Sequence, residues 1–264
     1  MSGVLVPGVP VGIAALGVVA VFGAMIGSFL NVCVCRWPAG ESVVRPRSHC
    51  RGCQTPISWR DNIPVVSWLL LAGRCRSCST PIPARYPAVE LATALIWTGL
   101  MMHYGLGWRL LTAGIFFTIL LGIAITDAAA YLIPDEFSLG GLALGLLLAF
   151  APGGMTIRSA VTGAVLGFSL LYVTAAAGEK LLKKPAMGGG DIKMLAMVGA
   201  FLGPWGAVLS LFLGSLVGSI VFLPVSFRSR RPVPFGVFLA VGAVITELWG
   251  AGLMEWYRTD LLGF

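Results

Sequence analysis

Two aspartates stand at the ends of long apolar stretches. Asp127 follows the uncharged run 110–126, and Asp191 shortly precedes the run 194–227. A carboxylate held near a bilayer is costly, so its presence there favours a functional role. If the two groups face each other, repulsion and partial burial make them share one proton. One carboxylate could then activate water while the protonated one polarises a peptide carbonyl, which is the chemistry of an aspartic peptidase.

Three glycines precede the second aspartate: Gly188, Gly189 and Gly190. Glycine permits φ > 0 and lets another backbone approach closely, so a peptide substrate could lie there as an extended strand. The same run predicts Asp191 in the first turn of a helix, and we assign Lys193 to the same substrate-binding loop. The residues alone leave an alternative open, in which Asp191 is a solvated helix cap and Asp127 a solvated loop residue.

Three other acidic residues allow simpler interpretations. Asp135 follows a proline and precedes an apolar run, so it is predicted to be an N-terminal helix charge. Glu90 and Glu247 lie inside apolar stretches, where each could be an interhelical hydrogen-bond partner or a site residue. Spacing does not decide between these roles.

Four cysteines form two C-x2-C pairs, Cys50 with Cys53 and Cys75 with Cys78. Each pair can present two thiolates from one tight turn, and two such turns give the four-sulfur tetrahedron that structural Zn²⁺ prefers. Disulfides or a redox pair are the alternative, which a cytosolic location disfavours. A closed four-thiolate site would serve to fold the segment around it. Cys33 and Cys35 are expected to be packing residues, and no internal repeat is expected.

The composition is that of a membrane protein. The chain of 264 residues is 57% hydrophobic and 11% charged, with a mean hydropathy of +0.90. The apolar runs are continuous rather than alternating, which favours spanning helices over a β-barrel. We predict an all-α polytopic membrane protein with about eight transmembrane helices, the sixth and seventh separated at Gly203-Pro204. Their approximate ranges are 11–33, 86–103, 108–126, 137–152, 158–178, 191–203, 205–227 and 234–253.

Basic residues set the predicted orientation. Of 18 Lys and Arg residues, most fall in three loops: 36–85, 180–184 and 228–231. This bias places the three loops, and with them both aspartates, on the cytoplasmic side of the membrane. Nucleic-acid binding is the weaker explanation of the net charge of +7. The expected organisation is a first transmembrane helix (1–35), a small cytoplasmic zinc-binding domain (36–85) and a membrane domain carrying the aspartates (86–264).

Several short motifs occur in the order typical of one family. Gly190-Asp191 completes a G-x-G-D motif, which alone is shared with presenilin-like proteases, and Pro234-Phe235-Gly236 forms the last motif. The remaining matching segments are 27–32 with Arg36, the two C-x2-C pairs, 60–64, 67–69, 73–76, 85–87 and 89–91. Over nearly its whole length the chain resembles the type IV prepilin peptidases, including the peptidases of type II secretion. It departs from the pattern in having Pro-Phe-Gly-Val where Pro-Phe-Gly-Pro is commoner.

The resemblance implies a specific activity. Asp127 and Asp191 would be the catalytic pair, and the substrates would be prepilins or pseudopilins whose short basic leader is removed after a glycine. Cleavage would occur at the cytoplasmic face of the bacterial inner membrane. By analogy, the enzyme would also methylate the new N-terminal residue with S-adenosylmethionine, although no glycine-rich dinucleotide-type motif marks a donor site.

Two functions of other classes compete with this interpretation. A transporter could relay protons through intramembrane acids, but such acids are expected near the midplane, and these two are expected at one face. A scaffold could use the zinc domain to recruit partners, with both aspartates inert.

Overall fold

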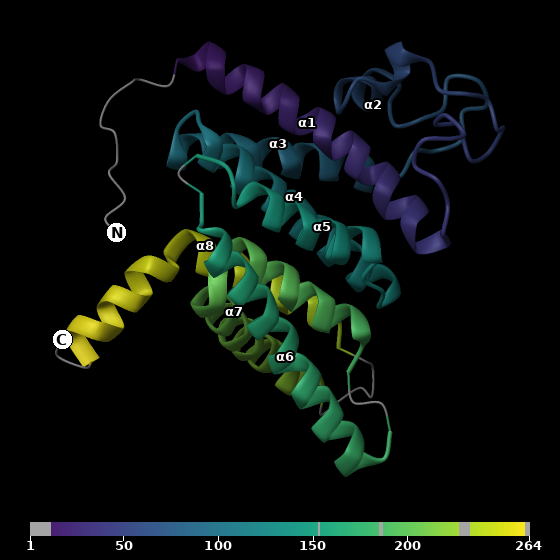
Figure 1. The fold of residues 1–264 in the computed structure, drawn as a ribbon. Coiled ribbons are helices and arrows are strands. Elements are labelled where there is room, and N and C mark those ends of the chain that lie inside the picture. Colours follow the sequence, from purple (N-terminus) through teal and green to yellow (C-terminus); the bar gives the residue numbers. More distant parts are fainter. Residues whose placement is uncertain (1–11, 153, 185–186, 227–232, 262–264) are drawn as a thin grey trace. The chain divides into compact units, whose positions relative to one another are not determined.

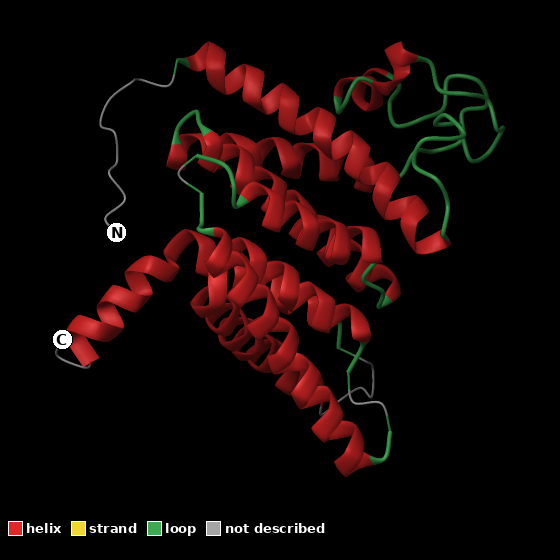
Figure 2. Cartoon of the chain, viewed as in Figure 1, coloured by secondary structure: helices red, strands yellow, loops and turns green. Residues whose placement is uncertain are grey.

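Helices make up the regular structure of the chain (Figures 1 and 2). The computed structural model describes residues 12–152, 154–184, 187–226 and 233–261. Within these residues no strand occurs, and the two isolated β-bridges both lie between α1 and α3. The α-helices are α1 (Ile13–Arg36), α2 (Val66–Leu70), α3 (Arg85–Tyr104), α4 (Trp108–Ala130), α5 (Asp135–Leu148), α6 (Ile157–Leu182), α7 (Gly189–Ser226) and α8 (Phe235–Trp256). The predicted all-α class is confirmed.

The apolar helices suit a bilayer. Five are long and apolar enough to cross one, namely those in Ile13–Ala39, Trp108–Ala130, Ile157–Leu182, Gly189–Phe222 and Phe235–Asp260. Two other predicted spans are also helical, although α3 carries Arg85 and Glu90, and α5 has 14 residues, about 21 Å of helix. The chain is a multi-pass membrane protein.

Helix α7 contains the predicted break. Gly203 has φ 73° and ψ −177°, a non-helical conformation at which two helices meet. This positive φ requires glycine, and Pro204 disfavours the helical conformation of the residue before it. The predicted separation of the sixth and seventh spans at Gly203-Pro204 is therefore confirmed.

Some predicted helix ends are wrong by a turn. Helix α4 runs to Ala130 rather than 126, so Asp127 lies inside its last turn. Helix α6 runs to Leu182 rather than 178, because charged residues can extend a helix beyond its apolar part. The helix ends at Lys183, which has a φ of 52°. The predicted basic group Arg228, Arg230 and Arg231 lies outside the described residues.

The chain forms two compact units, Met1–Thr118 and Ile119–Phe264. In the first, α1 lies along α3 (Figure 1). A Cβ on Gly27 would lie 2.7 Å from the Cα of Glu90, and one on Gly23 would lie 2.9 Å from the Cα of Ala94. Small residues four apart let transmembrane helices approach closely. The domain boundaries predicted from the sequence stay predictions.

In the second unit, α7 packs against α5, α6 and α8. Gly163 of α6 and Gly199 of α7 face each other, and a Cβ on either would meet the backbone carbonyl oxygen of the other. Lipid gives no hydrophobic driving force between helices, so such close packing holds the helices together.

Replacing Gly163 by valine should therefore disrupt the second unit. The new side chain meets backbone rather than a movable side chain, so we expect destabilisation of about 3 kcal/mol or more. Thermal denaturation of the purified protein in detergent would measure it. Gly140→Val is the matched control, because a Cβ on Gly140 has no neighbour within 4 Å. Equal melting temperatures for the two variants would contradict the packing argument.

Candidate active site and metal centre

The carboxylate of Asp127, in α4, is hydrogen-bonded to the backbone of α8. Asp127 is buried, with 5% of its surface exposed. Its Oδ2 accepts a hydrogen bond of 3.1 Å from the backbone N–H of Val237, in the first turn of α8. The first N–H groups of a helix have no partner within the helix, so they are free to bind a carboxylate. The Asp127 carboxylate thus binds an N–H group at the N-terminus of α8.

The second aspartate lies at the start of α7. Asp191 is half-buried in the first turn, as predicted. Gly190 beside Asp191 and Gly236 beside the Asp127 carboxylate both pack against Ile133, so the two aspartates border one region of the second unit. That their carboxyl groups face each other stays a prediction.

Ile133 joins the segments around both aspartates. It lies in the loop between α4 and α5 and is 7% exposed. A Cβ on Gly190, beside Asp191, would lie 2.9 Å from the Cβ of Ile133. A Cβ on Gly236, at the start of α8, would lie 2.8 Å from the Cδ1 of the same residue. Nothing in the sequence pattern marked Ile133, because its role depends on three segments far apart in the chain.

The three glycines act by their small size. A Cβ on Gly190 would meet the side chain of Ile133, and one on Gly188 would lie 3.3 Å from Oδ2 of Asp191. The close approach of a substrate backbone stays a prediction. None of the three has a positive φ, so the suggested use of left-handed backbone is not found. The reason is that α7 already begins at Gly189. A Cβ on Gly189 would have no neighbour within 4 Å, which leaves space beside the start of the helix.

An ion pair ties the starts of α5 and α7. The Nζ of Lys193 lies 2.7 Å and 2.9 Å from the two carboxylate oxygens of Asp135. Asp135 is in the first turn of α5, as predicted. Lys193 therefore supports the Ile133 loop from the side of α7, and a contact of Lys193 with substrate stays a prediction.

The four predicted metal ligands come together. Their Sγ atoms all lie within 4.8 Å of one another, and the cluster consists of Cys50, Cys53, Cys75 and Cys78. With a Zn–S bond of about 2.3 Å, a tetrahedral site has S–S edges of about 3.8 Å. The Sγ atoms of Cys50 and Cys78 are 3.7 Å apart. The residues present thus fit a structural zinc ion.

Two equivalent turns build this cluster. In each, the first cysteine donates its N–H to a threonine carbonyl at 2.9 Å, Cys50 to Thr55 and Cys75 to Thr80. The second cysteine of each turn contacts the hydroxyl of the same threonine, at 3.2 Å and 3.1 Å. The pattern C-R-x-C-x-T-P-I occurs at 50–57 and again at 75–82. The expectation of no internal repeat was wrong, and this pattern was the signal that could have shown it.

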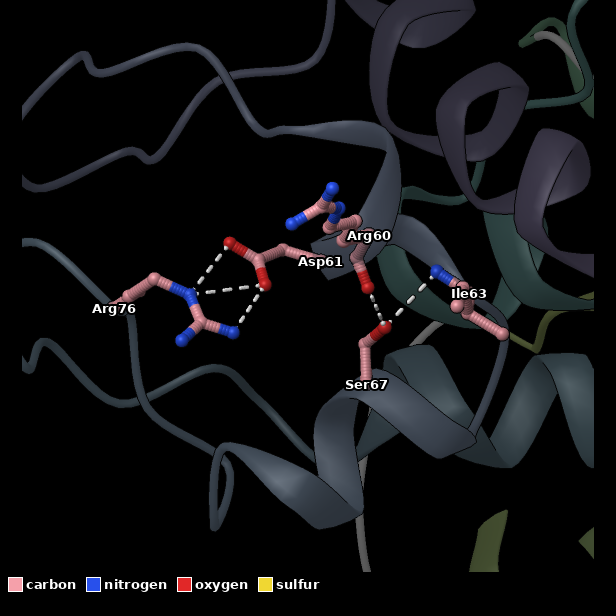
Figure 3. A network of polar contacts seen from close by, with 5 residues as sticks. All are labelled: Arg60, Asp61, Ile63, Ser67 and Arg76. Atoms are coloured by element: carbon pink, nitrogen blue, oxygen red, sulfur yellow. Dashed lines mark hydrogen bonds and ion pairs between the residues drawn. The ribbon is translucent and has the colours of Figure 1, made fainter.

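A polar network connects the second turn to the segment before α2 (Figure 3). Arg76 Nη2 lies 2.7 Å from Asp61 Oδ1, and its Nε donates to both carboxylate oxygens. The guanidinium holds the pKa of Asp61 below its usual value. Ser67 donates to the carbonyl of Arg60 at 2.8 Å and accepts from the N–H of Ile63 at 3.0 Å. Arg76 is thus paired with a carboxylate.

Glu90 binds a strained backbone. It is 8% exposed, and its Oε2 accepts a hydrogen bond of 2.7 Å from the N–H of Val65. Val65 has φ 61°, which is costly for a β-branched residue and is typical of functional sites. The sequence left open whether Glu90 is an interhelical hydrogen-bond partner or a site residue. The hydrogen bond that the structure shows goes to the loop before α2, not to another transmembrane helix.

A cavity of about 430 Å³ adjoins this hydrogen bond. It is bounded by the end of α1, the loops of the four-cysteine segment, α2 and the start of α3. Its wall includes Asn31, Trp68, Tyr86 and Glu90. The volume falls in the range of about 300–1,000 Å³ that is usual for small-molecule sites.

Comparison with known proteins covers both units. Residues 21–104 match the Bacterial Peptidase A24 N-terminal domain, and residues 114–223 match the Type IV leader peptidase family. The chain is 37% identical over 272 residues to the "Prepilin leader peptidase/N-methyltransferase" of Aeromonas hydrophila, covering 92% of this chain and 94% of that protein. It is 33% identical over 274 residues to the protein of the same name in Neisseria gonorrhoeae, covering 93% and 95%. No solved structure matches.

Proposed function

Since the chain belongs to the type IV leader peptidase family, we propose that it is a membrane aspartic endopeptidase that removes the leader peptides of prepilins or pseudopilins. Asp127 and Asp191 are its catalytic pair. The observation that carries this proposal is that Ile133 packs against both Gly190, beside Asp191 at the start of α7, and Gly236, which lies against the Asp127 carboxylate at the end of α4. Lys193 and the three glycines before Asp191 border the place where the peptide lies.

The pair hydrolyses the peptide bond by acid–base chemistry. One carboxylate removes a proton from water as the water oxygen bonds to the carbonyl carbon, while the other carboxyl group gives its proton to the carbonyl oxygen. When the C–N bond breaks, the leaving nitrogen takes the proton from the first group and a hydroxyl proton returns to the second. Such transfers contribute about 10²–10⁴-fold each to the rate.

The site faces the cytoplasm of a bacterial inner membrane. The support is the concentration of Lys and Arg in loops on the side of the two aspartates. The four-cysteine segment 36–85 lies on that same side, where a zinc ion holds its two turns together. Lipid surrounds the apolar helices.

The second activity is N-methylation of the new N-terminus, with S-adenosylmethionine as methyl donor. This activity is named in the relatives. The donor supplies a methyl group bound to a positively charged sulfur, and the amine of the cleaved protein receives it. The cavity beside Glu90 fits such a cation, because a buried carboxylate and the aromatic rings of Trp68 and Tyr86 line it.

Glu90→Gln should weaken binding of S-adenosylmethionine. The amide oxygen can still accept the hydrogen bond from Val65, so the change removes mainly the negative charge. We expect a loss of about tenfold in affinity, equivalent to about 1.4 kcal/mol. Calorimetric titration of the purified protein would measure it, with Glu179→Gln at the exposed end of α6 as the control. Equal affinities in the two variants would rule out this cavity as the donor site.

The function itself is tested with purified enzyme in liposomes and a prepilin substrate. Mass spectrometry of the product identifies both the cleaved bond and the mass of the new N-terminus. We expect the leader to be released in every case and a methyl group to be added only when S-adenosylmethionine is present. An intact substrate after prolonged incubation would contradict the peptidase proposal.

A further inference from the structure

We infer that Gly236 and the first turn of α8 fix Asp127 as the proton acceptor of the pair, so that the two aspartates are not interchangeable. This inference rests on the proposed peptidase function and assigns a role to each carboxyl group. It also makes Gly236, which touches neither water nor substrate in this proposal, a positioning residue.

The first observation is the asymmetry of the hydrogen bonds. The Asp127 carboxylate accepts a hydrogen bond of 3.1 Å from the backbone N–H of Val237, in the first turn of α8. Within the described residues, the carboxyl group of Asp191 has no hydrogen-bond donor of this kind. N–H donors and the positive end of a helix dipole stabilise a negative charge. In a pair that holds one proton, the proton therefore belongs on Asp191, and Asp127 is the carboxylate.

The second observation is that the contact requires glycine. A Cβ on Gly236 would lie 2.9 Å from Oδ2 and 3.2 Å from Cγ of Asp127, closer than such atoms normally approach. Any side chain would push the carboxylate away from the helix terminus. Helix α8 is itself held by α7, so it does not shift freely to make room.

These roles define the reaction. Asp127 takes the proton from water, and the water oxygen attacks the carbonyl carbon. Asp191 donates its proton to the carbonyl oxygen, which gives a gem-diol. Asp127 then protonates the leaving nitrogen as the C–N bond breaks, and a hydroxyl proton of the gem-diol returns to Asp191.

Gly236→Ala tests the positioning role kinetically. We expect kcat to fall about 10- to 100-fold, within the usual contribution of acid–base groups, while KM and the melting temperature change little. Val237→Pro, which removes a donor without adding a side chain at 236, should show the same pattern. Gly252→Ala is the control on the same helix, because a Cβ there has no neighbour within 4 Å. Wild-type kcat in Gly236→Ala would overturn the inference.

A second variant separates the carboxylate from simple packing. The Cβ added at 236 also meets the Cδ1 of Ile133, which Ile133→Val removes. If the defect of Gly236→Ala acts through Asp127, the double variant Gly236→Ala/Ile133→Val stays slow. Recovery of kcat in the double variant would assign the glycine to packing and overturn the inference.

The position of the proton can be tested without substrate. Infrared spectra of the protein in lipid show the C=O stretch of protonated carboxyl groups. We expect Asp191→Asn to remove one such band from the wild-type spectrum. Retention of the full band intensity would place the proton on Asp127 and overturn the inference, whether or not the protein cleaves prepilins.

Discussion

Replacing either Asp127 or Asp191, the proposed catalytic pair, by asparagine should reduce leader cleavage by about 10³-fold or more while the protein remains folded. Asparagine has nearly the same shape as aspartate but cannot exchange the proton that each step of the proposed reaction requires. In Asp127→Asn the amide oxygen can still accept the hydrogen bond from Val237, so the start of α8 keeps its partner. The rate of leader release from a prepilin in liposomes measures the effect.

The matched control is Asp260→Asn, at an exposed aspartate near the end of the chain. This variant should cleave at the wild-type rate. If both catalytic-site variants processed prepilin normally at equal protein levels, the proposed pair would be wrong. The aspartates would then have the solvated cap and loop roles that the sequence left open.

Loss of the metal should unfold the segment between α1 and α3. Structural zinc binding by four thiolates is worth about 10–16 kcal/mol in small domains, and such domains are unfolded without it. Within this segment the regular structure is limited to α2, two short 3-10 helices and two isolated bridges. We therefore expect Cys50→Ser/Cys75→Ser to lose bound zinc and to become sensitive to protease between residues 45 and 83.

Metal analysis of the purified protein gives the zinc content per chain, and limited proteolysis with mass spectrometry locates the cuts. Cys35→Ser is the control, because Cys35 lies outside the four-sulfur cluster and accepts a hydrogen bond from Arg85. That variant should keep one zinc ion. A wild-type protein that carries no metal when expressed with zinc would contradict the assignment.

The sequence predicted those features that depend on local pattern. The helical runs, the break at Gly203 and the C-x2-C pairs each follow from residues close together in the chain. The place of Asp191 in a first turn was predictable for the same reason.

Contacts between distant segments could not be predicted in this way. The bond from Glu90 to Val65 depends on how a loop folds back on α3. The wedge of Ile133 between Gly190 and Gly236 depends on the packing of α7 and α8. The hydrophobic periodicity of the sequence does not indicate either contact. The repeated cysteine turn is a different case, because the eight-residue pattern was present in the sequence and was missed.

The loop 131–134, which contains Ile133, bears on how the enzyme should respond to the lipid in which it is assayed. Only residues 131–134 connect α4 to α5, and Ile133 within them contacts the segments beside both aspartates. We therefore expect this four-residue connection and the Lys193–Asp135 ion pair, rather than the surrounding bilayer, to set the spacing of the two carboxyl groups. Lipids of different chain length should change how much enzyme folds, but the turnover of each folded molecule should remain the same.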